Sequence, residues 1–164
     1  MKVTNLILII VTIALLATSC NTQLSADDLA LRILNLYPSL PPCSQYVKDG
    51  EPYSTGYISA EDFSYLYIGE RSKLPEWDMI EEFRLILSDS TYPFEIHVIR
   101  LKTASDCDEI AKLLTRRAEL LSFHNKTEED YPAEEPLVIT KGHYVFLLAT
   151  YDNAAAKMLI DKLL

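Results

Sequence analysis

The chain has 164 residues and a net charge of −9, with 24 acidic and 15 basic side chains. Nucleic-acid binding depends on Lys and Arg side chains that neutralise phosphates, so this balance excludes a nucleic-acid partner. Anionic lipid headgroups also repel such a chain, so membrane attachment would have to come from a lipid. The four glycines are too few for a glycine-rich, phosphate-binding loop.

The N-terminus predicts an export signal. Lys2 is followed by an apolar run from Leu6 to Ala17, which is broken only by Thr12. A basic residue followed by about a dozen apolar residues is typical of a secretory signal, and a membrane-spanning helix needs roughly 20. We therefore expect residues 1–19 to form a signal peptide.

Small residues then lead directly to Cys20, in the run Leu16-Ala17-Thr18-Ser19-Cys20. This run resembles a bacterial lipobox, in which the cysteine receives a diacylglyceryl group and becomes the new N-terminus, although Ala17 stands where Leu is usual. Two acyl chains hold a protein stably at a membrane. We expect Cys20 to be lipidated. Cleavage without lipid and an uncleaved anchor are the alternatives.

The mature chain is expected to be one domain on a short tether. Residues 20–24 form the lipidated cysteine and its tether, and residues 25–164 have the usual size of a single domain. Four extended residues span at most about 14 Å, so the domain should lie almost against the headgroups. The expected location is the extracytoplasmic face of the cell membrane.

Helical spacing of apolar residues predicts the first element. Ser25 and Asp28 have the spacing of a capping box, and Leu29 and Ile33 follow on one helical face. Pro38 ends this helix because its nitrogen cannot donate a hydrogen bond.

The middle of the chain predicts strand, helix, strand. Aromatic and β-branched residues favour a strand over 62–68. Pro75 suits the first turn of a helix, with Trp77, Ile80 and Phe83 on its core face. Residues 94–101 are the next expected strand.

The remaining elements are a helix, a hairpin and a helix. Ser105 begins a helix with acidic residues in its first turn, where they meet the positive end of the helix dipole. Strands over 137–140 and 144–148 are joined by Lys141-Gly142, and Asp152 caps the last helix. This order predicts an α+β domain, with a mixed sheet of about four strands and helices on at least one face.

From Ser105 onward the chain carries a recognisable set of motifs. They are Asp108-Glu109-Ile110, Arg116-Arg117, Phe123, Tyr131-Pro132-Ala133-Glu134-Glu135 and Lys141-Gly142-His143-Tyr144-Val145. With Cys20 and Ala26-Asp27-Asp28-Leu29-Ala30, they resemble an uncharacterised family of small Gram-positive lipoproteins, defined as a domain of unknown function. The resemblance implies a lipid-anchored envelope protein with an α+β fold, and no reaction. Two features depart from the family: residues 70–93 look like extra material, and His143 stands where the family often has Asn.

Two cysteines remain beside Cys20. An exported domain lies where a disulfide can persist, and a Cys43–Cys107 bond could contribute up to about 4 kcal/mol. The alternative is two reduced thiols, because Cys107 falls on the apolar face of its helix and free Cys behaves as a small hydrophobe.

The chain shows no catalytic, cofactor or metal motif. His97, His124 and His143 lack the close spacing of zinc ligands, and no G-x-S-x-G elbow is present. His97 is expected on a half-exposed strand face.

Tyrosines and the single tryptophan mark the surface where we expect a partner to bind. Tyr46, Tyr53, Tyr57 and Trp77 have polar tips on aromatic rings, which suits a protein interface or carbohydrate stacking. The expected function is a non-enzymatic interaction module that binds another envelope protein or a wall polymer. The alternative is a small enzyme, or enzyme inhibitor, that acts on wall polymers through two carboxylates roughly 5–10 Å apart.

Overall fold

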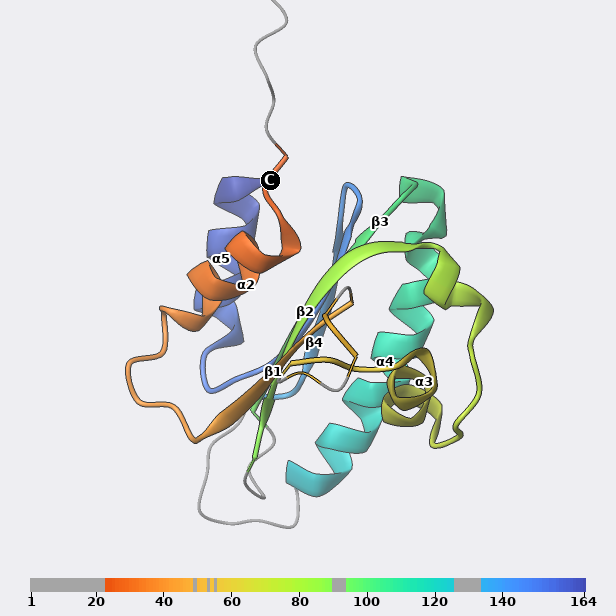
Figure 1. Cartoon of the computed structure of the whole chain (residues 1–164). Coiled ribbons are helices and arrows are strands. Elements are labelled where there is room, and N and C mark those ends of the chain that lie inside the picture. Colours follow the sequence, from red (N-terminus) through yellow and green to blue (C-terminus); the bar gives the residue numbers. More distant parts are fainter. Residues whose placement is uncertain (1–22, 49, 53, 55, 90–93, 126–133) are drawn as a thin grey trace, which may run out of the picture.

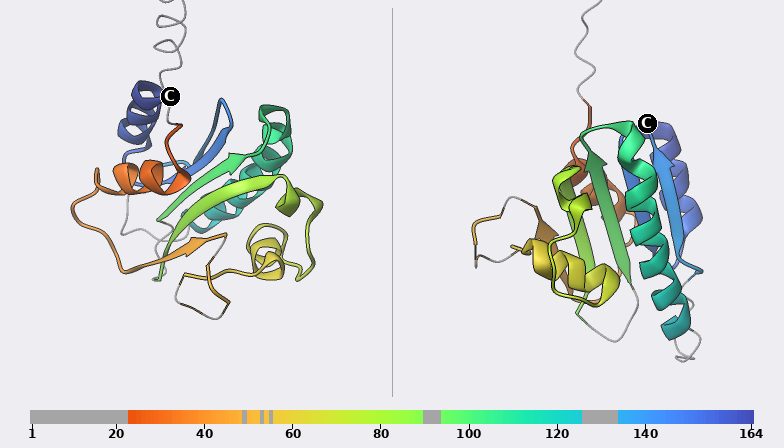
Figure 2. Two further views of the ribbon diagram at one scale, coloured as in Figure 1. Left: turned by 45° about the horizontal axis from the view of Figure 1, so that its top comes forward. Right: turned by 90° about the vertical axis from the view of Figure 1, so that its right-hand side faces the viewer.

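A computed structural model describes residues 23–164, except 49, 53, 55, 90–93 and 126–133. The expected signal peptide, Cys20 and Tyr53 lie outside the described residues. One five-stranded sheet runs through the domain and is covered by helices on both faces (Figures 1 and 2). This is the α+β fold that the sequence predicts. Within the described part of the chain, no helix is long and apolar enough to span a bilayer.

The sheet is antiparallel throughout, and its strands lie in the order β1-β2-β3-β5-β4. The strands are β1 (Cys43–Val47), β2 (Ile80–Ser88), β3 (Glu95–Leu101), β4 (Leu137–Lys141) and β5 (Tyr144–Ala149). The sheet therefore has five antiparallel strands, where a mixed sheet of about four strands was expected. The crossover after β3 does return β4 parallel to β3, but β5 inserts between the two and pairs antiparallel with each.

Two helices cover each face of the sheet (Figure 1). One face carries α2 (Ala26–Leu34) and α5 (Asn153–Leu163), and the other carries α3 (Ala60–Ile68) and α4 (Cys107–Asn125). The predicted caps of α2 and α5 are confirmed. Ser25 Oγ accepts the N–H of Asp28 at 3.0 Å, and Asp152 Oδ1 accepts the N–H of Ala155 at 2.8 Å.

Residues 60–68 form the helix α3, so the strand predicted over 62–68 is wrong. Ser59 Oγ accepts the N–H of Asp62 at 3.0 Å and donates to the Asp62 carboxylate at 3.0 Å. These bonds satisfy a backbone donor that a helix start leaves without a partner. Gly69 ends the helix in the left-handed region, at φ 75°.

The helix predicted from Pro75 is also wrong. Pro75–Asp78 forms only a short 3-10 helix, η1, and the chain from Ile80 onward is the strand β2. This strand pairs with β1 on one side and β3 on the other. Within the segment 70–93, residues 80–88 therefore form an inner strand of the sheet.

The sheet separates two hydrophobic clusters. Between the sheet and α3–α4 lie Phe63, Tyr67, Phe83, Leu114 and Leu147, with their neighbours. On the α2–α5 side, the cluster is built around Leu29, Ile33, Ile96, Phe146 and Ile160. Among the described residues, the two clusters together draw on side chains from Leu24 to Leu163.

The β4–β5 turn depends on a glycine. Gly142 has φ 59°, and nothing lies within 4 Å of the position its Cβ would take. Strain therefore arises from the backbone alone, and Gly142→Ala should lower the free energy of unfolding by about 1 kcal/mol. Urea unfolding should show this loss. Gly142→Asn should lose less stability than Gly142→Ala, because Asn tolerates a positive φ. Equal losses from the two variants would contradict the explanation.

Candidate functional site

The described chain begins at a fixed point on the sheet. The hydroxyl of Tyr144 in β5 donates a hydrogen bond to the carbonyl of Leu24. The N–H of Ala26 donates to Glu82 Oε1 in β2 at 2.7 Å. The backbone is therefore held from Leu24 onward, and only Asn21 and Thr22 lie between Cys20 and Gln23.

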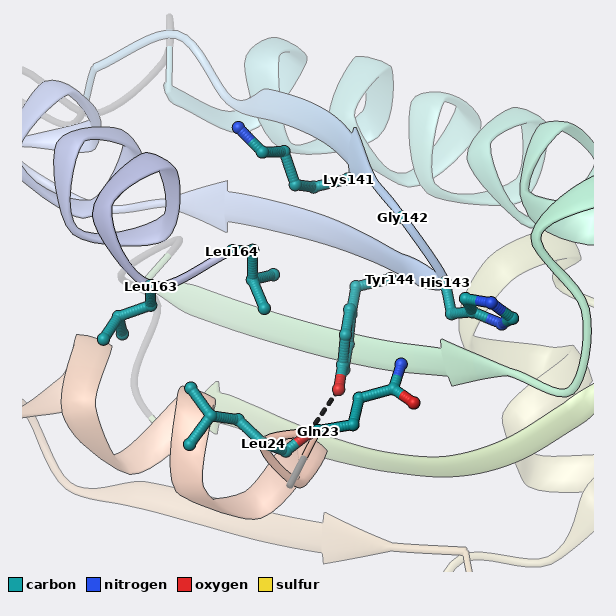
Figure 3. A pocket seen from close by; sticks show the side chains of 8 residues that line it. All are labelled: Gln23, Leu24, Lys141, Gly142, His143, Tyr144, Leu163 and Leu164. Carbon is teal, nitrogen blue, oxygen red and sulfur yellow. Dashed lines mark hydrogen bonds between the residues drawn. The ribbon is translucent and has the colours of Figure 1, made fainter. Parts of the chain in front are cut away.

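Both ends of the described chain lie at the same end of the domain (Figure 1). There Gln23 and Leu24 meet the β4–β5 turn, Leu163 at the end of α5 and the following residue Leu164, around a pocket of about 370 Å³. We call this the tether end. The residues that line the pocket are Gln23, Leu24, Lys141, Gly142, His143, Tyr144, Leu163 and Leu164 (Figure 3).

A second polar cluster is buried between β3 and the α3–α4 layer. Tyr67 Oη lies 2.7 Å from His97 Nδ1, and His97 Nε2 lies 3.0 Å from Glu95 Oε2. Arg117 Nε donates to the same carboxylate oxygen at 3.1 Å, and its Nη2 donates to Glu95 Oε1. The four side chains form one connected network, which we call the tetrad. It joins α3, β3 and α4.

Burial and pairing act in opposite directions on the Glu95 carboxyl. Burial alone raises its pKa, but hydrogen bonds and favourable electrostatic interactions with His97 and Arg117 bring the pKa below the usual value. Burial, and the nearby charge of Glu95, raise the pKa of Tyr67 well above its usual value. Glu95 is therefore an ionised group and Tyr67 a neutral hydroxyl at neutral pH.

Three of the four side chains of the tetrad are enclosed, and that of Arg117 is 22 % exposed. Tyr67 and His97 have no exposed surface, and Glu95 is 5 % exposed. A substrate cannot touch these groups while α3 and α4 are in place, so their role in this structure is to hold the two helices on the sheet. Buried charges need such complete pairing because desolvation is costly.

The lowered pKa of Glu95 makes stability depend on pH. An unfolded Glu has a pKa of about 4.3, and the folded value is lower, so the native state binds fewer protons in this range. The contribution is complete above about pH 5 and is lost as the pH falls through the folded pKa. Urea midpoints should therefore drop below about pH 4. Glu95→Gln should make the urea midpoint depend less on pH. If only the exposed control Glu119→Gln reduced the pH dependence, the assignment to Glu95 would be contradicted.

The structure describes three of the four proposed contact residues. Trp77 packs edge-on against Phe63 and Phe83, with ring centroids 5.3 and 5.8 Å apart, and is partly buried. Tyr46 is also partly buried against this cluster, and Tyr57 is partly exposed. Trp77 and Tyr46 thus contribute to packing, and their role in binding a partner stays a prediction.

Cys43 and Cys107 are both free. Cys107 lies in the cluster under α3 and α4, and Cys43 packs against the cluster on the other face. The sheet separates the two thiols, so the structure corrects the possible disulfide in favour of two reduced cysteines.

Sequence reasoning placed His97 on a half-exposed face, which is wrong because α3 and α4 cover this side of β3. His143 is partly exposed at the β4–β5 turn, with Nδ1 3.4 Å from the carbonyl of Leu101. Among the described residues, no group of three or more His, Cys, Asp or Glu side chains is placed to hold a metal ion.

Comparison with known proteins adds no further assignment. No family model matches the chain, and neither the curated proteins nor the solved structures give a match. The resemblance to small lipoproteins stays a prediction.

Proposed function

We propose that the mature chain is a lipid-anchored domain on the outer face of the cytoplasmic membrane and acts there as a non-enzymatic binding module. The observation that supports it best is the fixed start of the domain. Tyr144 and Glu82 hold the backbone at Leu24 and Ala26, a few residues after the lipobox-like Cys20. A fixed start suits an anchored domain, because it holds the fold in one orientation above the bilayer.

The buried tetrad supports binding over catalysis. The acid, base and hydroxyl groups that the structure brings together lie out of reach of a substrate. Their pairing gives the α3–α4 layer a rigid support, and rigid surfaces lose less entropy when a partner binds.

The α3–α4 layer is the surface that we propose for the partner. Tyr65 on α3 is 55 % exposed, and Leu120 and Phe123 on α4 are 47 % and 70 % exposed. Exposed aromatic and apolar side chains on one layer are typical of protein interfaces. The proposed partner is another envelope protein or a wall polymer.

The intact mass of the protein extracted from membranes tests the anchor. We expect a chain that begins at Cys20 and carries a diacylglyceryl group, and we expect Cys20→Ala to lose it. A mass that begins at Met1, or a cleaved chain without lipid, would overturn the proposal.

Cross-linking in intact cells tests the binding surface. A photoreactive residue at Tyr65 should give a defined adduct, whereas one at Met158, which is 70 % exposed on the opposite layer, should not. Adducts of the same size from both positions would contradict a role for the α3–α4 layer.

A further inference from the structure

The tether-end pocket combines an apolar wall with a polar rim. Leu24, Leu163 and Leu164 gather beside the ring of Tyr144, whereas the ring of His143 points away from them (Figure 3). Leu164 is 40 % exposed, and Leu24 and Leu163 are partly exposed. Three leucines that meet water at one end of a domain make a small apolar surface around a hollow.

The polar rim includes the ammonium group of Lys141. Lys141 Nζ lies 3.0 Å from Asp161 Oδ1 and is 37 % exposed. Asp161 also binds Lys157, so one carboxylate is shared between two ammonium groups. Gln23, which is exposed, adds an amide on the other side of the pocket. Lysines with apolar stems beside leucines suit the boundary between headgroups and acyl chains.

The tether brings this pocket to the bilayer. Gln23 lines the pocket and lies three residues after Cys20, which is a reach of at most about 10 Å. A lipid on Cys20 would therefore hold the pocket at the depth of the headgroups.

We infer that the tether-end pocket receives the headgroup region of a phospholipid from the leaflet that holds the anchor. This inference rests on the proposed function. The leucines contact the glycerol and the first acyl carbons, and Lys141 pairs with the phosphate. The domain thus contacts the membrane through its own side chains as well as through its lipid.

Quenching by brominated lipids tests the contact. The lipidated protein, with Trp77→Phe to remove the native indole, is placed in vesicles of equal phosphatidylcholine and phosphatidylglycerol that carry bromine near the top of one acyl chain. Leu164→Trp should lose most of its emission in these vesicles. The matched control Met158→Trp, at an exposed position within α5, should keep its emission. Adding Lys141→Glu should restore much of the Leu164→Trp emission.

Three results would overturn the inference. Unquenched emission from Leu164→Trp would show that the pocket faces water. Equal quenching of both indoles would show that the domain lies on its side. Quenching that Lys141→Glu leaves unchanged would contradict the contact between Lys141 and the phosphate. The mass of Cys20 is measured on the same sample. A missing lipid thus overturns the proposed function and the inference with it, whereas lipidated protein without quenching overturns only the inference.

Discussion

Arg117→Met is expected to lower the free energy of unfolding by about 3–5 kcal/mol, because it leaves the Glu95 carboxylate buried without its cation. Arg117 binds both oxygens of that carboxylate, and the Glu95 side chain is only 7 % exposed. His97 would remain the only described side chain that binds Glu95. The loss should therefore exceed that of a surface ion pair, which is typically below about 1 kcal/mol.

Urea unfolding of four variants measures this effect. The exposed neighbour Arg116→Met serves as the control and should change stability by less than about 0.5 kcal/mol. The double variant Arg117→Met with Glu95→Gln should lose less than the sum of the two single variants, since it removes the charge together with its partner. A strictly additive pair would show that Arg117 and Glu95 are not coupled in the folded protein.

Phe63→Ala should cost about 3–5 kcal/mol, the usual range for removing a buried aromatic ring. Phe63 is fully buried and lies 4.7 Å from the ring of Tyr67 and 5.4 Å from that of Phe83, measured between centroids. Its removal leaves a cavity in the cluster that holds α3 on the sheet. Thermal or urea unfolding measures the loss.

Tyr65→Ala is the matched control for Phe63→Ala. In a helix, positions 63 and 65 point to different sides, whereas in a strand they point to the same side. Tyr65 is 55 % exposed, so its replacement should change stability by less than about 0.5 kcal/mol. Similar large losses at both positions would contradict the helix α3.

Elements with local signals could be predicted from the sequence. Ser25 and Asp152 mark helix starts through bonds within a few residues. Lys141-Gly142 similarly marks a tight turn because a positive φ is needed there. The helices α2, α4 and α5, the strand β3 and the β4–β5 hairpin were therefore predicted with the right type.

The predictions were wrong for two elements whose conformation depends on distant contacts, the strand over 62–68 and the helix from Pro75. The aromatic residues over 62–68 alternate as in a strand, yet the Ser59–Asp62 cap starts a helix whose buried side holds Phe63 and Tyr67. In 80–88 the apolar spacing fits a helix as well as a strand. The pairing partners of β2 decide between them, and they lie on both sides of it in the sheet.

The tether-end pocket and the tetrad could be predicted only in part. Leu24, Lys141 and Leu164 are far apart in sequence, so only the fold shows that they line one pocket. For the tetrad a signal was present. Glu95, His97, Ile99 and Leu101 stand at every second position of β3 and so lie on one face. The apolar residues Ile99 and Leu101 indicate that this face is buried.

The position of α2 constrains how the chain can fold. This helix is the first described element of the chain, yet it packs on β2 and β3, and its N-terminus is bonded to Glu82. A nine-residue helix is marginal in water without such packing. The first helix is therefore expected to become stable only after residues 80–101 have paired as strands, because its contacts with them are distant in the sequence.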